Sequence, residues 1–131
     1  MIKIVTIVVS LIFLGLLIFF GTAEHLFRQS MAKGDVQLIR QAQRLNPFSS
    51  RYAYHEYRLT GDIDALRRAI ILEPTRPAYH MYYGLAQFKL LKRTRQTDRE
   101  GLKEICLAAE LKPNSRQYQK TCEQFRKALG Q

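Results

Sequence analysis

The chain lacks tryptophan and has little cysteine, and both facts limit its chemistry. Two cysteines, Cys106 and Cys122, are too few among 131 residues for a disulfide-rich scaffold or a thiolate zinc site. The three histidines, His25, His55 and His80, share no ligand spacing, so we expect no metal and no other cofactor. No nucleophile elbow, phosphate-binding glycine loop, pair of acids in an apolar setting or HExxH motif occurs. We therefore expect a non-catalytic protein.

Acidic residues are also scarce, at 11 Asp and Glu against 21 Lys and Arg, which gives a net charge of +10. Such a charge favours anionic partners: acidic protein surfaces, phospholipid headgroups or nucleic acid. Nucleic acid is the least expected, because no helix-turn-helix, zinc or RNA-binding signature accompanies the charge. The candidate residues for an anionic surface flank one predicted helix end: Lys89, Lys92, Arg93, Arg95 and Arg99. The same run would also complement a helix dipole and solvate a loop.

The first segment lacks charge. Ile4 to Gly21 is eighteen residues long and holds only Thr6 and Ser10 as polar side chains. As a helix it would be about 27 Å long, close to the thickness of a bilayer's hydrocarbon core. We predict a transmembrane helix over residues 1–21, which acts as a signal anchor. The helical pattern continues over residues 22–33, so this extension is expected to be the first helix of the first helix pair.

Two other interpretations of the first segment stay open. In a cleaved signal peptide, Met1–Lys3 would be the basic start, and Gly21 and Ala23 would occupy the −3 and −1 positions. A buried core helix is less expected, because no face of the segment is polar. Arg28 and Lys33 nearly balance the basic N-terminus, so the positive-inside rule does not fix the orientation. A short tail with one lysine is typical of a signal anchor, which favours a single-pass membrane protein with an extracytoplasmic (periplasmic) domain.

One phrase, Ala-x-x-Leu-x-Pro, occurs three times in the rest of the chain, at Ala42–Pro47, Ala69–Pro74 and Ala108–Pro113. Three residues before each Ala stands a branched apolar residue, and five after each Pro a tyrosine: Ile39, Leu66 and Ile105, then Tyr52, Tyr79 and Tyr118. Each copy is typical of a helix end, a tight corner and a new helix. The small Ala lets a neighbouring backbone approach, the Leu closes the corner, and the Pro stops the helix.

This phrase resembles the second-helix signature of tetratricopeptide (TPR) repeats, where a small residue precedes a corner proline by five positions. Gly84, ten residues after Pro74, matches the family's first-helix glycine. The resemblance covers roughly residues 34–129, and it implies an all-α, TPR-like solenoid of antiparallel helix pairs over 34–131. It also implies a role in protein–protein interaction. The positions of the family's peptide-carboxylate clamp hold other residues here: Tyr54, Arg58, Met81 and Leu85.

Two alignments of the first two repeats stay open. The prolines at 47 and 74 give a period of 27 residues. The stretches Ala53–Tyr57 and Ala78–Tyr82 resemble one another at a period of 25, which would place His55 and His80 at equivalent positions. In the second alignment the first inter-repeat loop is two residues longer than the second.

No segment shows a sustained period of two, so we expect no sheet. Helices are predicted over Val36–Leu45, Ser50–Thr60, Ile63–Leu72, 76–93, 97–111 and 115–129, with turns at Gly34-Asp35 and Gly61-Asp62. The helix over 76–93 is expected to be the longest outside the first segment, and Thr97–Glu100 to cap the next one. The last helix is amphipathic, as in a capping helix. We expect Cys106 and Cys122 to be buried free thiols, or a disulfide if the domain is exported.

The tyrosines are the main candidates for binding. All seven lie in predicted helices that would be the first of their pair, and such helices line the concave face of a stack. Three of them, Tyr52, Tyr79 and Tyr118, occupy the repeated position and are expected in the core. The candidate protein-binding residues are the other four: Tyr54, Tyr57, Tyr82 and Tyr83.

These features predict a membrane-anchored, non-catalytic scaffold or accessory subunit of a membrane or envelope complex. Its partners would be other proteins and the lipid bilayer. One alternative is a filament subunit, a homo-oligomer assembled through bundled hydrophobic N-terminal helices. Another is a basic module that binds anionic lipid or nucleic acid. About two and a half helix pairs are too few to hold a peptide firmly, which favours a subunit that completes itself against a neighbour.

Overall fold

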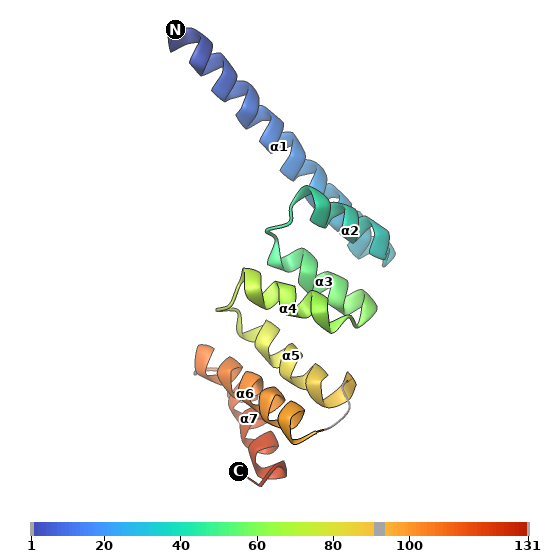
Figure 1. Ribbon diagram of the computed structural model, residues 1–131, viewed down its shortest axis with the longest axis vertical. Helices are drawn as coiled ribbons and strands as arrows, with labels where there is room; N and C mark the ends of the chain where they lie inside the picture. The colour runs from blue at the N-terminus through green and yellow to red at the C-terminus, as the bar shows by residue number, and fades with distance from the viewer. Residues whose placement is uncertain (1, 91–93, 131) are drawn as a thin grey trace.

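The computed structural model describes residues 2–90 and 94–130, and this part of the chain contains seven α-helices and no strand. The helices are α1 (Ile2–Lys33), α2 (Val36–Leu45), α3 (Ser50–Thr60), α4 (Ile63–Leu72), α5 (Pro77–Leu90), α6 (Arg95–Leu111) and α7 (Arg116–Ala128). They stack in chain order, and the two termini lie at opposite ends of the molecule (Figure 1). The all-α class predicted from the sequence is confirmed for the described residues.

The three proline corners have the same backbone geometry. The N–H groups of Asn46, Glu73 and Lys112 each donate to the carbonyl of the alanine four residues earlier, at 2.9, 3.0 and 3.2 Å. The carbonyls of the same three residues then each accept from the N–H three residues on. The next helix begins three residues after each proline. The recurring phrase therefore specifies one corner, made three times.

This geometry decides between the two alignments. Tyr52 and Tyr79 are each the third residue of their helix, so the repeats align at a period of 27. The alternative period of 25, and with it the equivalence of His55 and His80, is wrong. The similar local sequences of Ala53–Tyr57 and Ala78–Tyr82 suggested the period of 25, but the proline corners determine the residue at which each helix begins.

The core follows the phrase closely. Ile39, Leu66 and Ile105 are the largest apolar side chains that are fully buried, and the phrase alanines Ala42, Ala69 and Ala108 are fully buried as well. Each helix pair contributes one cluster of buried residues. The expected role of the leucines is wrong for the second and third corners. Leu72 and Leu111 are 37% and 36% exposed, whereas Leu45 packs against the first cluster.

The turns within the first two pairs match the sequence. Gly34 and Gly61 adopt positive φ angles of 67° and 74°, which glycine tolerates and other residues rarely do. The aspartate after each glycine then caps the next helix. Its carboxylate accepts from the backbone N–H two residues on, at 2.8 Å for Asp35 and 3.0 Å for Asp62. These turns fold α2 back on α1 and α4 back on α3.

Helix α1 is continuous from its apolar part into the stack. Ala23, Phe27 and Ser30, spaced four and three residues apart, are buried against α2 and α3. Two contacts with α3 reinforce this packing: Arg51 lies 2.5 Å from the Glu24 carboxylate, and the Phe27 ring stacks on Tyr52 at 4.7 Å. The stack thus has three complete pairs and a capping helix, one half-pair more than the sequence indicated.

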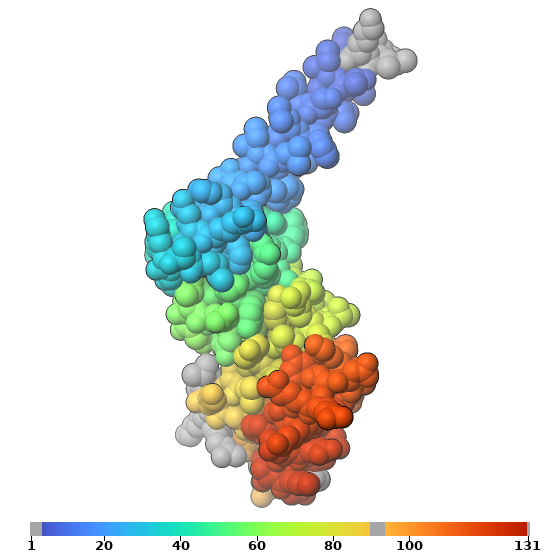
Figure 2. Space-filling model, turned by 180° about the vertical axis from the view of Figure 1, so that it is seen from behind, coloured from blue at the N-terminus to red at the C-terminus, as the bar shows by residue number. Residues whose placement is uncertain are grey.

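The apolar part of α1 stands free of the stack. Among the described residues it belongs to the one helix that is long and apolar enough to cross a membrane, a test that core helices and signal sequences also pass. None of this segment is buried, and its large side chains from Ile4 to Phe20 are 45–67% exposed. Figure 2 shows it projecting beyond the stack.

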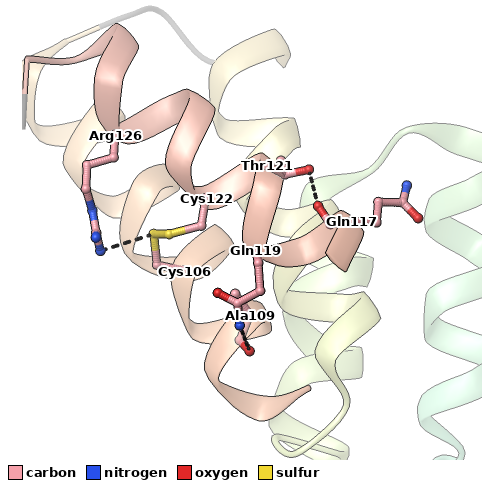
Figure 3. Close-up of a disulfide and its surroundings, with 7 residues drawn as sticks. All are labelled: Cys106, Ala109, Gln117, Gln119, Thr121, Cys122 and Arg126. Atoms are coloured by element: carbon pink, nitrogen blue, oxygen red, sulfur yellow. Dashed lines mark hydrogen bonds between the residues drawn. A yellow bond between two sulfur atoms is a disulfide. The ribbon is translucent and has the colours of Figure 1, made fainter. Parts of the chain in front are cut away.

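Two details near the C-terminus differ from expectation. Helix α6 begins at Arg95, because the capping box joins Thr94 to Thr97 and not Thr97 to Glu100. The helix expected over 76–93 is described as α5 from Pro77 to Leu90, and the last three residues of the expected range lie outside the described residues. The expected free thiols are wrong: Cys106 and Cys122 form a disulfide between α6 and α7 (Figure 3). The helices run antiparallel across the Pro113 corner and bring the two Cα atoms to 4.9 Å.

Helices α5 and α6 approach closely through two glycines. A Cβ atom on Gly84 would lie 2.6 Å from both the Gly101 carbonyl oxygen and Cγ1 of Ile105. A Cβ atom on Gly101 would lie 2.8 Å from the Phe88 ring. Gly84 was identified from the sequence, whereas Gly101 was not. Both are buried, and their backbones form the contact between the two helices.

We expect Gly84→Ala to lower the free energy of unfolding by about 2 kcal/mol, because the added methyl group meets backbone that cannot move aside. This cost exceeds the roughly 1 kcal/mol that alanine gains over glycine within a helix. The melting temperature, measured by circular dichroism, should fall by roughly 10 °C. Gly21→Ala is the matched control, since its Cβ meets nothing within 4 Å. Equal melting temperatures for the two variants would contradict this account.

Candidate protein-interaction surface

A groove lies on the face formed by the first helices of the pairs and by the capping helix. Its deeper part, of about 200 Å³, lies between α5 and α7. The lining side chains are neutral: Ala78, Met81, Tyr82, Leu85, Gln117, Tyr118 and Thr121. From Tyr82 the surface continues onto α3, because the rings of Tyr54 and Tyr82 lie 5.6 Å apart. We call this surface, including Tyr54 and Tyr57, the tyrosine groove.

Two tyrosines of the groove, Tyr54 and Tyr57, keep their protons at neutral pH. Burial, followed by the neighbouring Tyr82 hydroxyl, raises the pKa of Tyr54 to about 12. Burial and the charge interaction with Tyr82 also raise the pKa of Tyr57. The groove therefore offers neutral hydroxyl groups, which both donate and accept hydrogen bonds, beside apolar ring faces. Such a surface suits a polypeptide segment better than a cation.

The structure brings together three of the four predicted binding residues. Tyr54, Tyr57 and Tyr82 lie in the groove, and Tyr82 is 43% exposed. Tyr83 does not join them: its hydroxyl accepts from Arg67 of α4 at 3.1 Å, and the guanidinium lies over its ring. One position along a helix turns a side chain by about 100°, so adjacent tyrosines cannot share one face.

Of the three tyrosines expected in the core, two are there. Tyr52 and Tyr79 are 3% and 2% exposed. Tyr118 is only half-buried and lines the groove, so its expected burial is wrong. The position is the same in sequence, but Tyr118 is only partly buried against the cluster formed by α5, α6 and α7. Tyr118 is thus a candidate groove residue that the repeat pattern concealed.

A second hollow, of about 570 Å³, lies beside the disulfide. It is lined by Arg99, Lys103 and Arg126 together with Leu102 and Cys106. The Arg126 guanidinium reaches Sγ of Cys106 at 3.9 Å, as Figure 3 shows. We call it the basic hollow. Its three cations make no ion pair with any described residue, so their charge is available to an anionic group.

The predicted anionic surface coincides only partly with this hollow. Arg95 and Arg99 line one adjoining depression, which they share with Asp98. Lys89 is exposed on α5 and lines neither depression, and Lys92 and Arg93 lie outside the described residues. Lys103 was missed, although its spacing of four from Arg99 was visible. Arg126 reaches the basic hollow only because α7 packs against α6.

The basic hollow lies far from the apolar part of α1. The first turns of α6 and the last turns of α7 occupy the end of the stack opposite to the N-terminus (Figure 1). A bilayer crossed by α1 would therefore lie at the other end of the molecule. The basic hollow is poorly placed for headgroups of that bilayer and better placed for an acidic protein surface.

The sequence analysis also missed a buried acid. The Glu56 side chain on α3 is 5% exposed, and its two oxygens lie 2.9 Å from Nε of Arg40 and 2.6 Å from Nη2 of Arg68. Gln43 donates to it as well, at 3.0 Å. We call this set the Glu56 clamp. It joins α2, α3 and α4, on a different set of helix faces from the groove, and its role is structural.

His80 is likewise a structural residue. It is 4% exposed, with Nδ1 2.6 Å from the Glu104 carboxylate and Nε2 2.6 Å from the Pro74 carbonyl. These contacts join α5 to α6 and to the preceding corner. Across the described residues, no group of three or more His, Cys, Asp or Glu side chains is arranged to hold a metal ion.

Comparison with known proteins agrees on the fold. No protein-family model and no curated protein sequence matches this chain. Three similar solved structures are helical. The first TPR of Spaghetti (RPAP3), bound to the HSP90 peptide SRMEEVD, has a TM-score of 0.62 at 15% identity and covers 88% of this chain and 94% of its own. The Yersinia enterocolitica type III secretion chaperone SycD, in complex with a peptide of the translocator YopD, has a TM-score of 0.58 at 11% identity, covering 86% and 89%. A second SycD structure gives 0.52 at 12%, covering 88% and 87%.

Proposed function

We propose that this protein is a membrane-anchored, non-catalytic interaction module that binds a segment of another protein in the tyrosine groove. The observation that carries the proposal is the continuity of the groove. Tyr54 and Tyr82 join the surfaces of α3 and α5, and the hollow beyond them extends to α7. The segment bound there would belong to a subunit of a membrane or envelope complex.

The anchor is proposed from the exposure of the apolar part of α1. Large apolar side chains that are 45–67% exposed along an uncharged segment need an apolar environment, and a bilayer provides one along the whole segment. The packing also favours retention of this segment over its cleavage. Cutting after Ala23 would remove a fully buried residue from the first cluster of the core.

The disulfide supports an extracytoplasmic orientation. Disulfides persist in oxidising compartments and are rare in the cytosol. The bond between Cys106 and Cys122 therefore favours a stack on the outer side of the membrane. This agrees with the signal-anchor pattern, although the basic residues flanking α1 are nearly balanced.

The chemistry of the groove indicates what the bound segment would be like. No charged side chain lines the hollow, and Arg58 is the one basic residue among the four clamp positions. A groove of this kind does not select a terminal carboxylate. It suits an internal stretch with apolar or aromatic side chains, whose backbone amides bond to the tyrosine hydroxyls and to Gln117. The small number of helix pairs does not prevent peptide binding, because a TPR structure that covers a similar length of chain holds a peptide.

Photo-crosslinking followed by affinity measurement tests the proposal. A photoreactive phenylalanine analogue at position 82 of the full chain, in its native membrane, should crosslink to one segment of a partner. A peptide copied from that segment is then titrated against the purified protein. Replacing Tyr54 and Tyr82 by alanine should weaken its binding by about 30-fold, corresponding to about 2 kcal/mol for residues central to an interface.

Tyr83→Ala is the matched control, since it makes the same change one position along α5 but outside the groove. Its affinity should stay within about threefold of the wild type, a range typical of residues outside the centre of an interface. Circular dichroism of all variants shows whether they remain folded. If the Tyr83 variant loses as much affinity as the double variant, or if position 82 yields no crosslink, the groove is not the binding surface.

A further inference from the structure

The three proline corners form one edge of the stack, and this edge carries exposed apolar side chains. We call it the corner edge: residues 46–49, 73–76 and 112–115, with the helix turns that precede them. Phe48 is 80% exposed, the highest fraction among the large hydrophobic residues described, and Ile71 is 71% exposed. Both exceed every side chain of the free apolar part of α1. The fold does not require these side chains at such positions.

The first corner lies beside the end of the apolar segment of α1. On one side of this corner, Leu45 packs against the cluster that contains Ala23. On the other side, Arg51 and Tyr52 bond to the Glu24 carboxylate at 2.5 and 3.2 Å. Both flanks of the corner thus touch α1 only two or three residues beyond Gly21. Phe48, between them, is level with the point where the apolar segment ends.

The direction of α1 adds to this placement. Helix α1 does not continue the long axis of the stack but leans over the side on which the corners lie (Figure 1). A bilayer crossed by α1 therefore faces the corner edge obliquely, and it is nearest to the first corner. The opposite edge, with Gly34 and Gly61, is turned away from it.

We propose that the corner edge, led by Phe48, is a second membrane contact that lies in the phospholipid headgroup region and fixes the tilt of the stack. This inference rests on the proposed anchor. The side-chain chemistry fits, because Phe is among the apolar side chains with which membrane-surface segments enter the boundary between headgroups and acyl chains. The surrounding stretch, residues 42–52, contains Arg44 and no acidic residue, so it also favours anionic headgroups, whereas Arg51 is already paired with Glu24.

The absence of tryptophan makes this contact measurable. Phe48→Trp gives the full chain a single tryptophan. The purified variant is reconstituted into vesicles of phosphatidylcholine and phosphatidylglycerol, with and without lipids brominated on the upper acyl chain. Tryptophan next to bromine loses its fluorescence. We expect the emission of the Phe48→Trp variant to shift to the blue and most of it to be lost in brominated vesicles. Phe48 packs against nothing in the core, so the variant should fold normally.

Two further variants separate the possible results. Leu59→Trp places the reporter at the other end of α3, on an exposed residue of the opposite edge, and it should escape quenching. Phe20→Trp reports on the apolar segment itself. If Phe20→Trp is quenched while Phe48→Trp behaves like Leu59→Trp, the corner edge does not touch lipid and the inference is wrong, although the anchor stands. If Phe20→Trp also escapes quenching, α1 does not cross the bilayer, and both proposals fail.

Discussion

Replacing Glu56 by alanine is expected to lower the free energy of unfolding of the stack by about 3 kcal/mol, within the range for breaking a buried ion pair. Glu56 is the shared acceptor of the Glu56 clamp, so its loss removes the contacts to Arg40, Arg68 and Gln43 together. Both arginines are half-exposed, so water solvates them after the change and keeps the cost near the lower end of that range. Urea unfolding followed by circular dichroism measures the difference.

Glu123→Ala is the matched control, because Glu123 is exposed on α7 and forms no ion pair with any described residue. Its effect should stay within about 0.5 kcal/mol, as is usual for surface positions. A Glu56→Ala variant as stable as this control would show that the Glu56 clamp contributes nothing. Because the clamp lies away from the groove, peptide binding by the folded variant should be unchanged.

The Glu56 clamp also predicts a dependence on pH. Burial on its own raises the pKa of the Glu56 carboxyl, but hydrogen bonds from Arg40 and Gln43 and the charge of Arg68 outweigh it, so the pKa is lowered from its ordinary 4.5. The folded state therefore binds this proton more weakly than the unfolded state. The contribution of the clamp is complete above pH 4.5 and is lost as the pH falls through the lowered value. In Glu56→Gln this part of the acid dependence should disappear.

Removing the disulfide is expected to have an effect of similar size. Cys106 and Cys122 are 16 residues apart, and closing a loop of that length restricts the unfolded chain by about 3 kcal/mol. The double variant Cys106→Ser/Cys122→Ser should therefore unfold at a lower urea concentration than the oxidised protein. The loss should concentrate in α7, which packs mainly on α6 and is joined to it by this bond. Hydrogen exchange of the α7 amides localises the effect.

The control for this change is the wild-type protein after reduction. It should match the serine variant, because both lack the bond but keep the packing around it. Thiol labelling in intact cells extends the test. If the stack is extracytoplasmic, neither cysteine should react with a maleimide until a reductant is added. Free thiols in freshly isolated protein would contradict both the bond and the orientation that we infer from it.

The sequence predicted most of the fold because the corner phrase combines several strong local signals. Proline and alanine positions located the corners, Gly-Asp pairs located the turns, and the bounds of α2, α3 and α4 were predicted without error. In the third helix pair, α5 and α6, the sequence signals for helix ends were weaker. Two threonines three residues apart competed with the expected capping box, and the structure places the helix start at the earlier one.

Much less of the site could be predicted, because it depends on which helix faces meet. Tyr54 and Tyr83 looked equivalent in sequence, yet one lies in the groove and the other pairs with Arg67. Glu56 looked like any surface acid, since its arginine partners lie on α2 and α4, between 12 and 16 residues away. Arg126 enters the basic hollow from a helix that no spacing rule connects to Arg99. Such contacts belong to tertiary packing, and periodicity along one helix does not contain them.

The unbroken course of α1 has a consequence for how the protein is aimed. A single helix passes from the apolar segment into the first pair without a hinge, and Glu24 and Phe27 hold it to α3. If α1 crosses a bilayer as proposed, the direction in which the groove faces around the membrane normal is therefore set by the rotation of the helix along this stretch. One residue added near Thr22 would swing the groove by about 100°. In a protein anchored as proposed, the number of residues in that stretch would decide which neighbours in the membrane plane the groove faces.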